Sequence, residues 1–249
     1  MKEELIRTEM LLGSAAVDRL AHAHVAVFGI GGVGGHVTEV LARSGVGELT
    51  LVDSDRVNLS NLNRQIIATH ETVGQNKVDA AADRIRSINP NCVVHTFPLR
   101  YEDTNQELFF TRKYDYIADC IDLVKCKLDL ICTALERGIP ILSAMGTGNK
   151  VDPFQLRITD LSKTEGCHLA RVMRKELRAR GILHTQVLFS PELPIKPLDL
   201  VENDPGRRST PASCAWVPAC AGLMMGGHIV QALGQNAALS HLPEKEGSL

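Results

Sequence analysis

The sequence has no Cys-x-x-Cys pair, although it contains seven cysteines in 249 residues. An odd number of cysteines without such a pair fits neither a secreted disulfide framework nor a four-cysteine zinc site. We therefore expect reduced, mostly buried thiols and no zinc. A charge excess is also missing, because 27 basic and 29 acidic residues give a formal net charge of −2. Any binding of a polyanion then depends on a local basic patch.

The N-terminal segment lacks the order of a secretory signal, because acidic residues precede any apolar stretch in MKEELIRTEMLLG. On this ground we expect a cytoplasmic chain. The apolar stretch at 211–233 approaches the roughly 20 residues that a membrane span needs. Gly226, Gly227 and His228 interrupt it, so a buried C-terminal helix with no membrane partner is the better interpretation.

Short apolar runs alternate with segments of helical period up to about residue 146, which is typical of βαβ units. We expect an α/β fold, Rossmann-like and doubly wound, with a mostly parallel sheet. The last helix of this region should end at Gly138, because glycine favours helix C-termini. The expected strands are 24–28, 48–52, 92–97, 114–120 and 141–144, and the expected helices are 36–43, 77–87 and 125–137.

The second half of the chain is less regular, with expected strands at 155–159 and 186–189 on either side of a helix at 168–180. Residues 190–212 hold five prolines, which indicates a long and mobile loop. We expect a single domain over 1–249, made of a nucleotide-binding core at 1–146 and an elaborated, mixed C-terminal part at 147–249.

A glycine-rich turn follows the first expected strand and contains Gly29, Gly31, Gly32 and Gly34. Such glycines let the backbone approach a phosphate or ribose, and the following helix presents its N-terminus to the ligand. Asp53 ends the next strand 19 residues after Gly34, where an acidic side chain accepts hydrogen bonds from ribose hydroxyls. The combination predicts a bound mononucleotide or dinucleotide.

Polar residues downstream of that strand favour a triphosphate over NAD. Asn61, Arg64 and Gln65 lie in the segment DSDRVNLSNLNRQ, and Lys77 opens the next expected helix. Arg64 can bind phosphate oxygens through its planar guanidinium, and Lys77 adds a compact positive charge. Taken singly, Arg64 is better explained as a surface salt bridge and Lys77 as a solvated helix residue, so the prediction depends on their combination.

Two aspartates, Asp119 and Asp122, stand at the end of the strand 114–120. The carboxyl edge of an open α/β sheet is where ligands bind. One of the two carboxylates can hold Mg²⁺ near the phosphates, and we favour Asp122. The alternative role for Asp122 is to cap the following helix.

Six motifs occur in the order and spacing of the ubiquitin-activating-type (ThiF/MoeB/HesA) superfamily, and the chain from Arg7 to Asp122 resembles it: RTEMLLG, GIGGVGG, LVDSD, SNLNRQ, VGQNK and ADCID. The resemblance implies an ATP-binding domain that adenylates a carboxylate. It also implies a homodimer, because Arg7 resembles the arginine that related dimers supply to the neighbouring ATP site. By this resemblance, Gly32 approaches the nucleotide, Asp53 binds ribose beside Asp55, the triphosphate is held by Asn61, Arg64 and Lys77, and the metal lies at Asp122.

The segments 161–182 and 216–230 resemble the branch of this superfamily that dehydrates threonylcarbamoyladenosine in tRNA. This implies that ATP activates the threonyl carboxylate, after which the neighbouring carbamoyl oxygen closes a ring. The implied partners are the anticodon arm of tRNA and a sulfur-relay protein. Two alternatives stay open: an adenylyltransferase for a ubiquitin-like sulfur carrier, and an NAD-binding oxidoreductase or nucleotide sensor.

A basic helix is expected in CHLARVMRKELRARG, where apolar residues form one stripe and four basic residues lie largely on the other side. Phosphate contacts from such a face give salt-dependent affinity without base specificity, which suits an anticodon arm. A solvated surface helix is the alternative. Cys167, just before the helix, is a candidate reactive thiol, with core packing as its alternative. The basic residues are Arg171, Arg174, Lys175 and Arg178, and Arg207 and Arg208 are expected to extend the patch.

Overall fold

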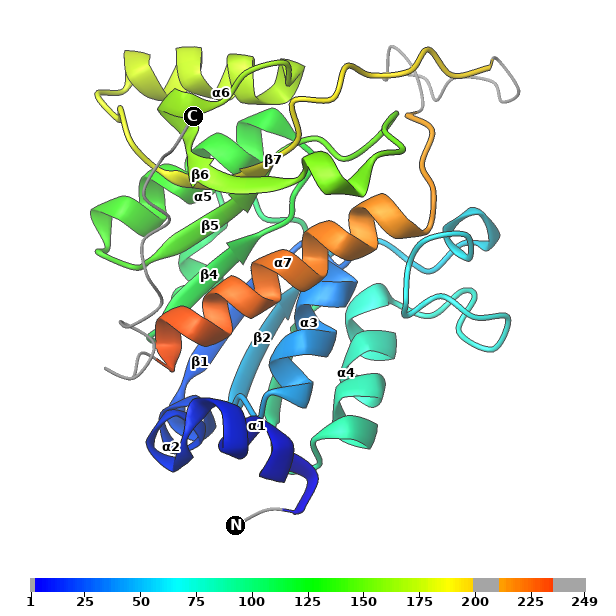
Figure 1. Ribbon diagram of the computed structural model, residues 1–249, viewed down its shortest axis with the longest axis vertical. Helices are drawn as coiled ribbons and strands as arrows, with labels where there is room; N and C mark the ends of the chain where they lie inside the picture. Colours follow the sequence, from blue (N-terminus) through cyan, green and yellow to red (C-terminus); the bar gives the residue numbers. More distant parts are fainter. Residues whose placement is uncertain (1–2, 199–210, 235–249) are drawn as a thin grey trace.

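A seven-stranded sheet forms the centre of the protein in the computed structural model, which describes residues 3–198 and 211–234 (Figure 1). The strand order is β3-β2-β1-β4-β5-β7-β6. All neighbouring strands are parallel except β6, which pairs antiparallel with β7. The prediction of an α/β fold with a mostly parallel sheet is therefore confirmed. The strands are β1 (His24–Phe28), β2 (Glu48–Val52), β3 (Val93–Phe97), β4 (Tyr116–Asp119), β5 (Ile141–Ala144), β6 (Arg157–Asp160) and β7 (Gln186–Phe189).

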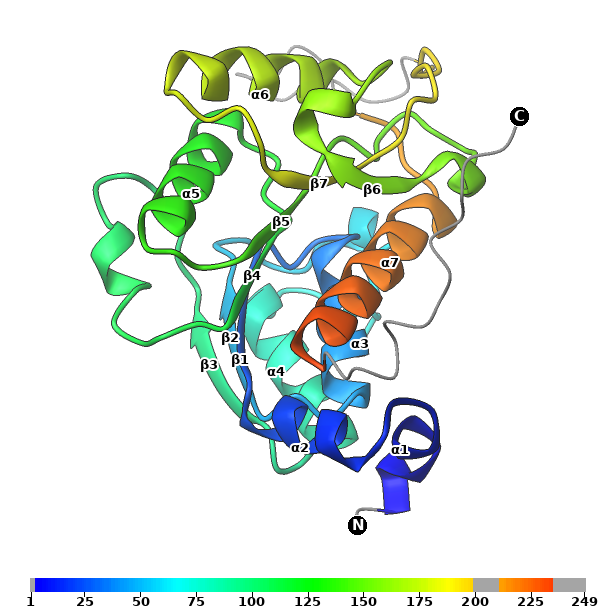
Figure 2. The same ribbon diagram turned by 60° about the vertical axis from the view of Figure 1, so that its left-hand side comes forward.

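Helices cover both faces of this sheet, so the core has two apolar layers (Figures 1 and 2). One layer contains residues from α2, α3, α4 and α7, and the other contains residues from α5 and α6. Alternate residues of one strand serve the two layers: Val25 and Val27 of β1 belong to the first, and Ala26 and Phe28 to the second. The helices are α1 (Ile6–Leu12), α2 (Ser14–His22), α3 (Gly34–Arg43), α4 (Lys77–Ile88), α5 (Val124–Glu136), α6 (His168–Ala179) and α7 (Trp216–Leu233).

The expected elements agree with the observed ones to within two residues at most ends. The observed strand β4 is shorter than the expected strand 114–120. In place of the expected strand 155–159, the structure has a 3₁₀ helix at Pro153–Gln155 followed by β6. Helix α5 ends as predicted at Gly138, whose φ of 66° is accessible to glycine. The sequence analysis did not identify α1 and α2, which are short helices that depend on packing of residues such as Leu20 against the core.

Helix α7 crosses α3 at close range. A Cβ atom added to Gly226 would lie 2.6 Å from Cβ of Val40, and one added to Gly222 would lie 2.3 Å from the Val33 carbonyl oxygen. Glycine is thus required at both positions for the two helices to approach. By length and composition α7 is apolar enough to cross a membrane, but the core helix of a soluble protein passes the same test. Its buried face, with Met225 and Ile229, packs in the first apolar layer, as expected for a buried C-terminal helix.

A carboxylate joins α3 to α4. Glu39, which is 8% exposed, accepts hydrogen bonds from Arg84 of α4 and from Arg43 one turn further along α3, at 2.7 Å each. Burial opposes ionisation of this group, but the two arginines outweigh it and hold the pKa of Glu39 below its ordinary value. The ion pairs therefore stabilise the contact between these helices.

Candidate active site

A cavity of about 700 Å³ opens at the carboxyl ends of the parallel strands. Phe28, Val52, Cys120 and Ala144, at or just beyond the ends of β1, β2, β4 and β5, belong to its wall. This is the edge at which open α/β sheets bind their ligands. The volume lies within the range of small-molecule and cofactor pockets.

The glycine-rich turn packs against the end of β4 and is open towards the cavity. Gly29 has φ of 89°, and a Cβ atom there would lie 2.6 Å from the Cys120 carbonyl oxygen. A Cβ atom on Gly34 would lie 1.8 Å from the Gly29 carbonyl oxygen. Gly31 and Gly32 line the cavity, and nothing lies within 4 Å of a Cβ position on Gly31. Gly29 and Gly34 therefore shape the turn, while Gly31 leaves space beside the backbone for a ligand.

Asp53 connects this turn to the end of β2. Its carboxylate accepts hydrogen bonds from the backbone N–H of Ile30 at 2.6 Å and of Asp55 at 2.8 Å. Burial raises the pKa of Asp53 above its ordinary value, against the opposing effects of Lys77 and these N–H groups. Both carboxylate oxygens keep acceptor capacity for a further donor, such as a ribose hydroxyl.

The cationic wall of the cavity comes from the segment after β2, and Asn61, Arg64, Gln65 and Lys77 all contribute to it. Nζ of Lys77, whose side chain is 7% exposed, lies 2.7 Å from a carboxylate oxygen of Asp55. Arg64 donates to the Ser60 carbonyl oxygen and to Asn63 Oδ1, both at 2.9 Å. Burial lowers the pKa of Arg64. The structure thus places two cations of the expected set at one cavity.

The side-chain amides of Asn61 and Gln65 in this segment differ in the hydrogen bonding of their oxygen atoms. Asn61 Oδ1 accepts the backbone N–H of Asn58 at 3.0 Å, which holds the 3₁₀ turn at Leu59–Asn61. Gln65 is 6% exposed, and its Oε1 has no hydrogen-bond partner among the described residues. A buried amide oxygen without a partner costs free energy, so a donor from a ligand would relieve it.

The two aspartates after β4 have separate surroundings. Asp119 is fully buried, and its carboxylate accepts from Lys127 Nζ at 2.7 Å and from the Ser143 hydroxyl at 2.6 Å. Asp122 lines the cavity, and the N-cap residue of α5 is Leu123. Of the two, only Asp122 is placed to meet a metal in the cavity.

The C-terminal part contributes residues that the sequence analysis did not identify. Lys150 lines the cavity, is 5% exposed, and donates from Nζ to the Ser190 carbonyl oxygen at 2.6 Å. Burial lowers the pKa of Lys150. His168 lies in the same wall, and so does Cys167, the buried thiol that the sequence analysis had already named as a candidate. Lys150 follows β5 in the sequence, which places it near this edge of the sheet but does not report that the lysine is buried in the cavity wall.

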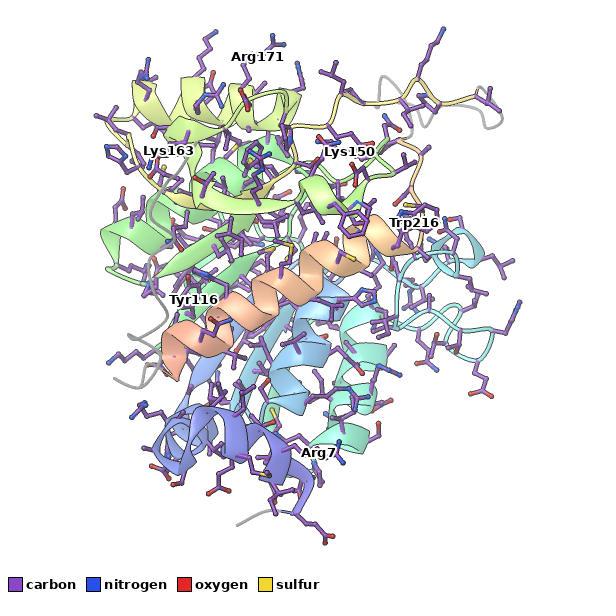
Figure 3. The ribbon with its side chains drawn as sticks, in the orientation of Figure 1. Arg7, Tyr116, Lys150, Lys163, Arg171 and Trp216 are labelled. Atoms are coloured by element: carbon purple, nitrogen blue, oxygen red, sulfur yellow. The ribbon has the colours of Figure 1, made fainter. Side chains whose placement is uncertain are left out.

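Arg7 does not belong to this cavity. It is exposed on α1, and Figure 3 shows it at the end of the molecule remote from Lys150.

The basic helix α6 lies at the top of the molecule in Figures 1 and 3, and its first residues, His168 and Leu169, line the cavity. Arg171, Lys175 and Arg178 are exposed, whereas Arg174 is half-buried and donates to the carbonyl and hydroxyl oxygens of Thr164. A guanidinium nitrogen of Arg171 lies 2.9 Å from Nδ1 of His168, a cavity residue. The exposed basic face therefore begins at the cavity wall. Arg207 and Arg208 lie outside the described residues, as does the part of the expected loop at 199–210.

Known proteins resemble this chain over most of its length. A sequence model of the ThiF family matches residues 5–246. The tRNA threonylcarbamoyladenosine dehydratase of Bacillus subtilis is 40% identical over 254 residues, which cover 98% of this chain and 100% of that protein. The crystal structure of Escherichia coli tRNA N6-threonylcarbamoyladenosine dehydratase in complex with ATP has 32% identity and a TM-score of 0.84, with 97% of each chain covered. The adenylyltransferase and sulfurtransferase UBA4 of Saccharomyces cerevisiae is 34% identical over 156 residues, covering 63% of this chain and 34% of that protein.

Proposed function

The chain belongs to the ThiF family, and from this premise we propose that it uses ATP to dehydrate threonylcarbamoyladenosine in tRNA. The observation that carries the proposal is a single cavity that joins the open glycine turn, Asp53, the two cations Arg64 and Lys77, and Asp122. The similarity to dehydratases of this kind extends through both halves of the chain. Since tRNA is the substrate, the enzyme acts in the cytoplasm.

ATP fits the polar groups of this cavity. Gly31 leaves room for a phosphate or ribose beside the backbone, and Asp53 keeps acceptor capacity for ribose hydroxyls. Lys77 and Arg64 place positive charge in the same cavity, where the triphosphate would lie. Gln65 Oε1 would find a donor in the bound nucleotide.

The proposed reaction requires stabilisation of the negative charge that develops on the phosphate oxygens of ATP. A carboxylate oxygen of the substrate attacks the α-phosphorus of ATP, the bond to the bridging oxygen breaks, and pyrophosphate leaves. The carbamoyl oxygen then attacks the acyl carbon, AMP leaves with the former carboxylate oxygen, and the adjacent N–H loses its proton. Arg64 and Lys77 stabilise the negative charge that develops on the phosphates in the first step, and no protein nucleophile is needed in the second.

We assign a magnesium ion to Asp122, whose carboxylate lies in the cavity wall. Mg²⁺ prefers one or two carboxylates together with phosphate oxygens and water. When bound, the ion would neutralise part of the triphosphate charge. Asp119 is excluded from this role because Lys127 and Ser143 occupy its carboxylate.

The anticodon arm would dock on α6. Its exposed cations, Arg171, Lys175 and Arg178, supply phosphate contacts, and the helix begins beside the cavity at His168. A modified base held in the cavity would thus lie next to a backbone held on the helix. Charge-reversing variants at these three positions should weaken tRNA binding and reduce its salt dependence, while ATP binding is retained.

Arg7 supports a homodimer in which each chain completes the site of its partner, because the residue lies far from the cavity of its own chain (Figure 3). Mixing Arg7→Ala chains with Asp122→Ala chains tests this. Half of randomly formed dimers would carry one intact site out of two, so activity should recover to about a quarter of the wild-type value. No recovery in stable mixed dimers would remove Arg7 from the site. A sulfur-relay partner stays a prediction.

The decisive experiment for the whole proposal incubates the chain with ATP and threonylcarbamoyladenosine-containing tRNA. We expect a modified nucleoside lighter by one water, with AMP and pyrophosphate as nucleotide products. Release of ADP instead would replace adenylation by phosphoryl activation. An unchanged nucleoside mass with an enzyme that binds both ligands would refute the proposal. The sulfur-carrier alternative is less well supported, because the match to UBA4 covers only 34% of that protein.

A further inference from the structure

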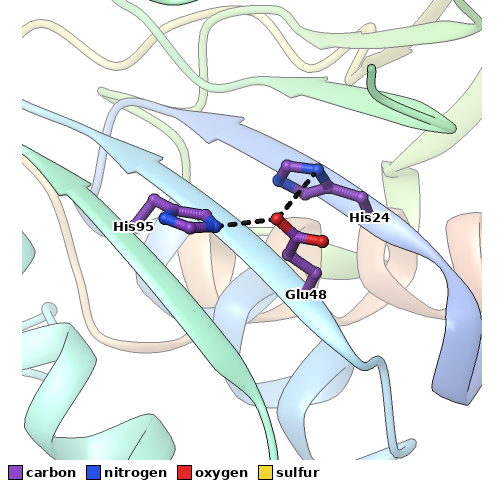
Figure 4. A group of neighbouring side chains, drawn as sticks. All are labelled: His24, Glu48 and His95. Carbon is purple, nitrogen blue, oxygen red and sulfur yellow. Dashed lines mark hydrogen bonds and ion pairs between the residues drawn. The ribbon is translucent and has the colours of Figure 1, made fainter. Parts of the chain in front are cut away.

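Three ionisable side chains meet on one face of the sheet, at the end opposite the cavity (Figure 4). His24, Glu48 and His95 come from β1, β2 and β3. The strand register brings them together, since His24 pairs with Glu48, and His95 pairs with Thr50, two residues along β2 on the same face. Buried parallel strands are normally apolar, so this group requires an explanation.

Their ligand atoms are close enough to share one ion. One such atom from each residue lies within 4.8 Å of the other two. Glu48 Oε1 is 2.7 Å from Nε2 of His95 and 3.4 Å from Nδ1 of His24. Around tetrahedral zinc, ligand atoms are separated by about 3.4 Å. The separations among the three ligand atoms, from 2.7 Å up to at most 4.8 Å, bracket this value.

The surroundings of His24 suit a metal ligand. Its other ring nitrogen, Nε2, lies 2.8 Å from the Thr50 hydroxyl. Ligand histidines commonly use their second nitrogen in this way, which fixes the ring orientation. His24 is 6% exposed, whereas 23% of the His95 side chain and 35% of the Glu48 side chain are exposed. An ion bound here is therefore reachable from solvent on one side and keeps a position for water.

We propose that His24, Glu48 and His95 bind a zinc ion that ties the first residues of β1 and β2 to the middle of β3. This site contains no cysteine, so it differs from the four-cysteine zinc site that the sequence excludes. Two imidazoles and one carboxylate form a donor set of borderline softness, which favours Zn²⁺ over Mg²⁺ or Ca²⁺. The three strands carry the glycine turn and Asp53 at their other ends. The ion stabilises that half of the sheet and takes no part in the dehydratase reaction.

Arg112 is the neighbouring group that opposes this binding. Its Nε lies 3.9 Å from Glu48 Oε1, and its side chain is 45% exposed. A positive charge at this distance repels a divalent ion, although solvent screens the effect. Removing this charge should therefore tighten zinc binding, whereas removing a ligand should weaken it. A hydrogen-bonded triad with no metal predicts neither change.

The test measures Zn²⁺ binding to the full-length chain after chelator treatment, under reducing conditions. When zinc is added back, the wild type should bind one Zn²⁺ per chain. Its melting temperature should rise with zinc concentration. His95→Gln should weaken binding by at least roughly tenfold, and Arg112→Gln should tighten it by roughly threefold. His70→Gln, at an exposed histidine outside the cluster, serves as the matched control and should leave affinity unchanged. His95 is preferred to the buried His24 because its substitution is less disruptive to folding.

Cobalt substitution identifies the ligands. Co²⁺ at this site should give the visible bands of tetrahedral nitrogen and oxygen coordination, without a thiolate charge-transfer band. Equal zinc affinity in the wild type and His95→Gln would overturn the proposal. So would a thiolate band, absence of zinc binding, or an Arg112→Gln affinity that does not increase.

Discussion

Replacing Lys77 by methionine separates a catalytic role from a structural one. The side chain of Lys77 is 7% exposed and its ammonium pairs with Asp55, whose side chain is 60% exposed. Because solvent screens that partner, the pair contributes at most about 1 kcal/mol to folding. Methionine keeps the aliphatic volume and removes a buried charge, a change that is often neutral or stabilising. We therefore expect the free energy of unfolding to change by less than about 1 kcal/mol.

The same substitution should be severe for the reaction. A preorganised charge that faces developing negative charge contributes about 3–4 kcal/mol to transition-state stabilisation, so kcat/KM should fall by about 10²-fold or more. The assay follows ATP-dependent loss of water from tRNA-bound threonylcarbamoyladenosine, alongside urea unfolding of the same preparations. Asp55→Asn is the matched control, because it breaks the same ion pair and leaves the ammonium in place. Activity of Lys77→Met within threefold of wild type, together with lost stability, would refute the reasoning.

Four further substitutions test the structure. Lys127→Ala leaves the fully buried carboxylate of Asp119 without its cation, so it should lower the free energy of unfolding by about 3–5 kcal/mol in urea titrations; a loss below 1 kcal/mol would contradict the buried pair. Gly34→Ala forces a Cβ atom to 1.8 Å from a carbonyl oxygen and should destabilise by at least about 2 kcal/mol, whereas Gly31→Ala, with open space, should spare stability and weaken only ATP binding by calorimetry. Glu39→Gln should cost about 1.5–3 kcal/mol at pH 7. Since the pKa of Glu39 is lowered in the folded state, the difference in free energy of unfolding between the wild type and Glu39→Gln should persist above roughly pH 4.3 and shrink as the pH falls further. A difference that does not change with pH would exclude the ionised pair.

Much of the fold was predictable because local and global signals agree. Each strand of the first half is an apolar run bounded by turn residues, and Gly138 ends a helix as its sequence position predicts. Helices α1 and α2 were missed because short helices of seven and nine residues are stabilised by tertiary contacts that no local pattern reports.

The site was predictable where its residues follow strand ends in sequence. Arg64 and Lys77 reach the cavity from the segment after β2, as expected. Lys150 was missed because its burial depends on the Ser190 carbonyl oxygen, 40 residues away, and an isolated lysine after a strand carries no such information. The half-buried state of Arg174 has the same origin, since the contact with Thr164 spans ten residues and consumes part of the expected basic face.

The cavity is lined by both expected parts of the chain. Its wall includes Gly32 of the nucleotide core and Pro218 of α7, whose Cβ atom would lie 3.1 Å from a Cβ atom on Gly32. Helix α7 returns to pack on α3, the helix that the glycine turn begins. A chain ending at residue 146 would lack both the Lys150 wall and the helix that covers α3. The cavity wall is therefore built from both the glycine turn of residues 1–146 and the C-terminal part that also carries the basic helix.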